Sequence, residues 1–119
     1  GIVRLVIDNA SDEDLKLLDH SMKKFLKELK SPNATLDRAN KCDIEYHRLL
    51  GKLSHNPIVE RIYSFVIELF TPTINPIHAG VYEAHNNLHN AVMSRNIDLA
   101  ISCVRTHTDI WVQSHQDKF

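Results

Sequence analysis

The spacing of glycine and proline constrains the fold of this chain more than any other feature. Three glycines and four prolines occur among 119 residues, and they cluster between long stretches that contain neither. Because these two residues interrupt regular structure, the stretches between them favour helices. The chain is therefore predicted to be all-α, a single domain over residues 1–119 that folds as an antiparallel bundle of about six helices.

Apolar residues recur at steps of three and four within these stretches, as they do on the buried face of a helix. Ser11 and Asp14 predict a capped helix start, and Asn96 is expected to turn the chain and cap the last helix. Helices are expected near residues 2–9, 11–31, 35–54, 58–70, 77 or 81 to 95, and 97 to near the C-terminus. The helix over 58–70 is apolar almost all round, which is typical of the central helix of a bundle.

Charge and composition exclude several classes of protein. Fourteen Lys and Arg against fifteen Asp and Glu give a net charge of −1, whereas binding to nucleic acid requires a basic surface. No apolar run reaches the roughly 18 residues that a membrane span requires. Two cysteines are too few for a disulfide scaffold, so the cytoplasm is the expected location. Because Gly1 opens inside an apolar segment, we expect this chain to be a piece of a longer protein with its first helix truncated.

Three polar residues, Asp43, His85 and His107, stand where the helical periodicity calls for apolar ones, and His47 joins them on the inward face of its helix. Asp43 and His47 share one face of the third expected helix, since they are four residues apart. His85 and His107 lie on the apolar stripes of the last two helices, 11 residues before and after Asn96, so an antiparallel hairpin places both about 16 Å from the turn. Burying such groups is costly unless they are paired or bind a metal. One carboxylate and three imidazoles predict a divalent metal site.

Each of these features also has a plain structural interpretation. An Asp and a His four residues apart are usually a solvated pair, and a histidine on an apolar stripe is usually a satisfied core residue. His89 could bond a ligand histidine or contact a bound anion, or simply be partly exposed. Cys103 is expected to be a small core residue. The other histidines are expected to be exposed: His20, His55, His78 and His115.

Two short motifs resemble a known family. They are Asp43-Ile44-Glu45-Tyr46-His47-Arg48 and Ser54-His55-Asn56-Pro57. They are similar to the D-x-x-[FY]-H-R and S-G-N-P signature of the FCD domain, the all-helical C-terminal effector domain of FadR-type GntR transcription regulators. The family's later H, A-[IV], A and H positions are matched in order and spacing by His85, Ala91-Val92, Ala100 and His107. The resemblance covers essentially the whole chain.

The resemblance implies a function and a ligand set. In metal-containing members of the family, the positions of Asp43, His47, His85 and His107 bind a divalent metal, commonly zinc or nickel, and small carboxylates bind in the same cavity. Asn56 is expected either to line the effector pocket, with His89 as a further contact, or to cap the helix near Pro57. His55 departs from the family's small residue and disfavours a left-handed turn there unless it adopts one itself.

These observations together predict a metal-dependent ligand-sensing domain of a bacterial transcription regulator, not an enzyme. DNA binding is implied only through a winged-helix N-terminal domain that this chain lacks, and the family implies a homodimer. Two alternatives stay open: a helical-bundle metalloenzyme with an open metal site, and a metal-free interaction bundle. A two-metal enzyme centre is disfavoured because such centres use Glu-x-x-His pairs, whereas His47 and His85 each follow a glutamate by two residues.

Overall fold

The computed structural model describes residues 2–33, 35–70 and 81–105, and in this part of the chain it contains helices and no strand. The elements are α1 (Ile2–Asn9), α2 (Asp12–Lys30), α3 (Leu36–Leu53), α4 (Pro57–Phe70) and α5 (Val81–Met93). Residues 97–105 form the described part of a further helix. The prediction of an all-α bundle is confirmed.

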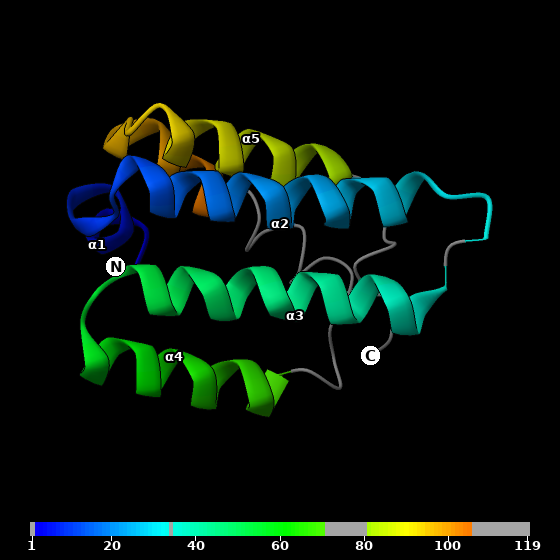
Figure 1. Ribbon diagram of the computed structural model, residues 1–119, viewed down its shortest axis with the longest axis horizontal. Helices are drawn as coiled ribbons and strands as arrows, with labels where there is room; N and C mark the ends of the chain where they lie inside the picture. Colours follow the sequence, from blue (N-terminus) through cyan, green and yellow to red (C-terminus); the bar gives the residue numbers. More distant parts are fainter. Residues whose placement is uncertain (1, 34, 71–80, 106–119) are drawn as a thin grey trace.

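The helices pack as antiparallel neighbours (Figure 1). The α2–α3 pair forms the centre, α4 lies on the far side of α3, and α5 packs against α2, while α1 lies at the end of the bundle and contacts α3 and α5. The core between them is closed mainly by large side chains of α2 and α3. The fully buried members of this set are Leu18, Met22, Phe25, Tyr46 and Leu50. Each contributes about 1.5–3 kcal/mol through burial of its apolar surface.

Side-chain caps fix where the helices begin. Ser11 and Asp14 form the predicted capping box at the start of α2, each side chain accepting a hydrogen bond from the other residue's backbone N–H. Asn96 Oδ1 accepts from the N–H of Leu99, as expected of a cap. Asn56 Oδ1 accepts from the N–H groups of Ile58 and Val59, both at 3.2 Å, and so caps α4.

Two residues with positive φ close the turns after α3 and α5. His55 (φ 52°) and Arg95 (φ 56°) both adopt the left-handed conformation, which costs about 1 kcal/mol or more for a residue with a Cβ. Their side chains offset this cost by bonding to neighbouring elements. Arg95 donates to the carbonyl oxygens of Ile7 and Ala10 at 2.7 and 2.8 Å, and His55 Nε2 lies 2.8 Å from Asp14 Oδ2. His55 thus adopts the left-handed turn itself, in place of a small residue.

The expectation that α4 is central is wrong. This helix lies at the edge of the bundle and packs mainly on α3. Ile67 on one face is buried, whereas Ile58 and Phe65 on the opposite face are 72% and 65% exposed. All-round apolarity shows only that both faces of a helix are hydrophobic, and it does not show that the same chain buries both of them. No helix among the described residues combines the length and apolarity that a bilayer span needs.

Candidate metal centre

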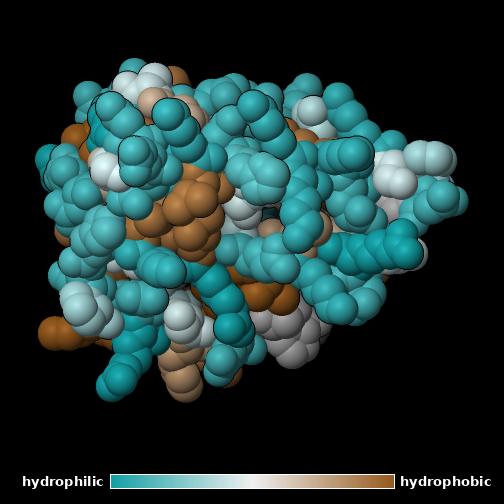
Figure 2. Space-filling view, in the orientation of Figure 1, coloured by the Kyte–Doolittle hydropathy of each residue, from teal (hydrophilic) through white to brown (hydrophobic). Residues whose placement is uncertain are grey.

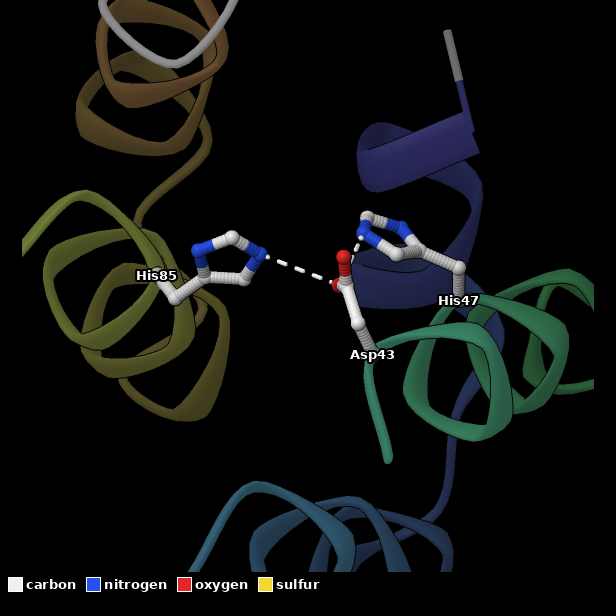
Figure 3. Close-up of side chains that lie close together, drawn as sticks. All are labelled: Asp43, His47 and His85. Atoms are coloured by element: carbon white, nitrogen blue, oxygen red, sulfur yellow. Dashed lines mark hydrogen bonds and ion pairs between the residues drawn. The ribbon is translucent and has the colours of Figure 1, made fainter. Parts of the chain in front are cut away.

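Three of the predicted ligands meet in the interior of the bundle (Figure 3). Asp43 and His47 project from adjacent turns of α3, and His85 reaches toward them from α5. Asp43 Oδ1 lies 3.0 Å from His47 Nε2 and 3.1 Å from His85 Nε2. The side chains of Asp43 and His85 are 4% and 3% exposed, and that of His47 is 19% exposed. We call Asp43, His47 and His85 the Asp43 cluster.

The donor atoms of the Asp43 cluster have the chemistry and spacing of a transition-metal site. One ligand atom from each residue lies within 4.8 Å of the others. Around a tetrahedral zinc ion with bonds of roughly 2.0–2.1 Å, neighbouring donor atoms stand about 3.3 Å apart, close to the two observed contacts of 3.0 and 3.1 Å. Imidazole nitrogen with carboxylate oxygen suits zinc or nickel. The three residues therefore fit a divalent ion with modest side-chain rotation.

The charge state of the cluster follows from its burial and its internal contacts. Burial by itself would raise the pKa of the Asp43 carboxyl, but the charge of His47 and the hydrogen bonds from His47 and His85 hold that pKa well below its usual range. Burial likewise opposes a charged His47, yet the oxygens of Tyr63 and Asp43 raise its pKa to about 10. Without a metal, the pair is therefore an aspartate and an imidazolium at neutral pH.

Tyr63 of α4 supports the cluster and was not among the site residues predicted from the sequence. Its hydroxyl lies 2.8 Å from His47 Nδ1. Since Nδ1 carries a proton and donates to Tyr63, Nε2 is the nitrogen that faces Asp43, which is the orientation a metal ligand needs. The ring fits because Gly51 presents no Cβ: a methyl group there would lie 3.1 Å from Tyr63 Cδ1. Gly51, one turn after His47 inside a helix, was the available signal of this close approach.

Phe25 of α2 packs against the ring of His85, with centroids 5.0 Å apart and the planes inclined at 51°. Phe25 is fully buried, so it provides an apolar wall on the α2 side of the cluster. Excluding water from that side strengthens electrostatic interactions between the carboxylate and any cation beside it.

His89 belongs to a separate hydrogen-bonded chain, which we call the Asp19 chain. Tyr46 O–H donates to His89 Nδ1 at 3.0 Å, and His89 Nε2–H donates to Asp19 Oδ1 at 2.8 Å. His89 is 3% exposed, so the alternative of a partly exposed residue is wrong. Burial lowers the pKa of His89, and the same burial raises that of Tyr46, so both are neutral at pH 7.

The remaining sequence expectations divide between the described residues and the rest. His20 and His55 are exposed, as expected. Cys103 packs against the edge of the core. Asn56 makes the capping contacts, which is one of its two expected roles. The predicted ligand His107 lies outside the described residues, as do His78 and His115.

Comparison with known proteins agrees with the geometry. The family model of the FCD domain matches residues 1–109. No match was found among curated proteins or among solved structures. Since the family model spans nearly the whole chain, this protein belongs to the FCD domain family.

Proposed function

We propose that the Asp43 cluster, with His107 as a fourth ligand, holds a divalent metal ion through which the domain senses a small carboxylate metabolite. FCD domains are regulatory, bind small-molecule effectors in transcription regulators and are not typically catalytic. The observation that carries the proposal is the convergence of one carboxylate and two imidazoles, from α3 and α5, within 4.8 Å inside the bundle.

Zinc and nickel are the proposed ions, because mixed imidazole and carboxylate donors suit both. Such an ion supplies a Lewis-acidic position that a carboxylate oxygen can occupy. The chain's own part is to orient the donors: Tyr63 holds His47, and Phe25 keeps water from the α2 side. Asn56 and His89 are retained as proposed effector contacts. For His89, such a contact requires exchange of one of its two present hydrogen bonds.

Effector binding between α3 and α5 gives a physical route to regulation. A ligand that binds one arrangement of two packed helices better than another shifts the population toward it. In a homodimeric, cytoplasmic GntR-type parent protein, we propose that this shift is passed to attached DNA-binding domains. The coupling is a difference in binding free energy between two states, so a carboxylate and DNA would change each other's affinity by the same factor.

The first test is metal binding by the purified chain. Elemental analysis and titration with Zn²⁺ and Ni²⁺ are expected to give one ion per chain, and a chelator is expected to lower the melting temperature. His85→Gln should weaken binding by about 100-fold or more, whereas His20→Gln, which alters an exposed histidine, should leave it unchanged. Failure to bind either ion overturns the proposal. With metal bound, a thermal-shift screen of mono-, di- and tricarboxylates then tests the effector class.

A metal-free bundle is the rival that one observation favours, since Asp43 already accepts hydrogen bonds from both histidines. In that case Asp43→Asn and His85→Gln would lower stability equally with and without chelator. A chelator-induced loss of stability that disappears in those variants excludes the rival. The two outcomes are distinct because only a bound ion links stability to chelator concentration.

A further inference from the structure

The exposed face of α4 carries a continuous apolar ridge. Its residues are spaced at steps of four, three and four, which is the spacing of a coiled-coil seam. They are Ile58, Ile62, Phe65 and Leu69, with exposed fractions of 72%, 59%, 65% and 60%. The buried Ile67 lies on the opposite side of the helix, toward α3, so the ridge points away from the bundle that the described residues form.

An apolar ridge of this size is unusual on a water-facing helix. Half of the large hydrophobic residues exposed in the described part of the chain lie on α4, where Val66 flanks the ridge. Figure 2 shows separate hydrophobic side chains along the lower left edge, where α4 lies in Figure 1, in addition to a larger hydrophobic patch at the centre left of the same face. Scattered apolar residues need no explanation, but a contiguous patch marks an interaction surface.

The charges beside the ridge indicate what covers it. Arg61 and Glu68 stand one heptad apart on one flank, both exposed, while the other flank carries Val59 and Val66. When two copies of such a helix pair antiparallel, equivalent flanks face each other, so Arg61 of each copy meets the partner's Glu68. The two side chains then differ by about 3 Å along the axis, at 1.5 Å per residue. A parallel pair instead sets Arg61 beside the valine flank and forms no ion pair.

We propose that α4 is the interface of a twofold dimer, in which it packs antiparallel against α4 of a second copy of this chain. Such a pairing buries the ridge against itself and forms the Arg61–Glu68 contact twice, as an isologous interface requires. Within one copy, Glu68 Oε1 lies 3.6 Å from Arg48 Nη2, with both side chains more than half exposed, so that contact is weak and can be shared. This pairing requires neither a metal ion nor an effector.

Sedimentation of the 119-residue chain tests the proposal. At micromolar concentration and low salt, the chain is expected to sediment at twice the 13.7 kDa of one copy. Phe65→Glu should weaken dimerisation by about 100-fold or more, because it buries a charge in the centre of the ridge. The matched control is Leu17→Glu, since Leu17 is 58% exposed on α2, and it should leave the dimer intact. A monomeric chain, or a Phe65→Glu variant that still dimerises, overturns the proposal.

A charge exchange tests the antiparallel arrangement without touching apolar residues. Arg61→Glu and Glu68→Arg should each weaken the dimer by about tenfold, because each puts like charges together twice. Mixing the two single variants should restore it, since every contact between different copies is then a Glu–Arg pair. The effect should shrink at high salt. If the mixture associates no better than either variant alone, the antiparallel α4 pair is wrong.

Discussion

The Asp43 cluster and the Asp19 chain use the same parts in different ways. His85 and His89 lie one turn apart on α5, and each places Nε2 about 3 Å from a carboxylate oxygen. The carboxylate beside His85 is buried and receives a second imidazole, whereas Asp19 is 31% exposed and bonded to Lys23 at 2.8 Å. The hydrogen bonds from Lys23 and His89 lower the pKa of Asp19.

The two regions differ in how the hydrogen-bond donors and acceptors of their side chains are paired. The Asp19 chain alternates donor and acceptor from Tyr46 through His89 to Asp19, and Lys23 balances its charge at the surface, so it is complete without another component. The Asp43 cluster turns two imidazole nitrogens toward one buried oxygen. A cation that replaces the protons there would gain three donor atoms at once. Histidine and carboxylate in contact are therefore insufficient evidence of a metal site, and the arrangement of donors decides.

The largest expected effect comes from removing one carboxylate charge from each region. Asp43→Asn is expected to weaken Zn²⁺ binding by at least about 100-fold, more than the loss of an outer-sphere partner usually costs. Asp19→Asn is the matched substitution in the Asp19 chain and should change affinity by less than about twofold. Competition with a chromophoric chelator measures both. If the two variants lose affinity equally, the distinction between the two regions fails.

The second expected effect is on the free energy of unfolding, to which His47 and His89 contribute with opposite dependence on pH. The pKa of His47 is raised to about 10, so in the metal-free protein its stabilising contribution is fully present below about pH 6.5 and is lost as pH rises toward 10. The pKa of His89 is lowered by burial, so its contribution is present above about pH 6.5 and is lost as the solution becomes more acidic. Denaturant unfolding of the chelator-treated protein at several pH values measures both slopes.

Metal affinity should rise with pH as His47 loses its proton. His47 must release a proton before Nε2 can bind the ion, so affinity is expected to increase about tenfold per pH unit below its pKa. Asp43 stays ionised across this range and adds no slope. His89→Gln should leave the pH dependence of metal binding unchanged. An affinity that is independent of pH between 6.5 and 8.5 would contradict the assignment of His47 as a protonated ligand.

Periodicity identified the fold and part of the candidate site because both depend on which residues share a helix face. Asp43 and His85 stood on apolar stripes, and this alone was enough to predict that they are buried. Tyr63 and Asp19 were missed because their contacts depend on how α4 and α2 sit against neighbouring helices. The position of α4 was mispredicted because hydropathy shows that a helix face is apolar but not whether the same chain buries it.

The smallest expected effects separate two tyrosines that each bond a histidine. Tyr63→Phe removes the acceptor for His47 Nδ1–H, so metal affinity should fall by about tenfold, while stability should change little, because the His47 side chain is 19% exposed and water can replace the lost hydroxyl group. Tyr46→Phe leaves His89 Nδ1 unpaired in the core, so the free energy of unfolding should fall by about 1–2 kcal/mol with metal affinity unchanged. Chelator competition measures the metal affinity of each variant, and denaturant unfolding measures its free energy of unfolding.

Both variants lose one hydroxyl group and keep the ring, so the comparison between them is closely matched. We expect one variant to lose metal affinity and the other to lose stability. A general loosening of the bundle would lower stability and metal affinity together in each of them. Gly51→Ala adds an independent check, since its methyl group would press on the Tyr63 ring from 3.1 Å without removing the hydroxyl. Gly51→Ala should weaken metal binding, but by less than Tyr63→Phe does. The double variant should bind the metal no more weakly than Tyr63→Phe alone, because both substitutions act through the same hydrogen bond.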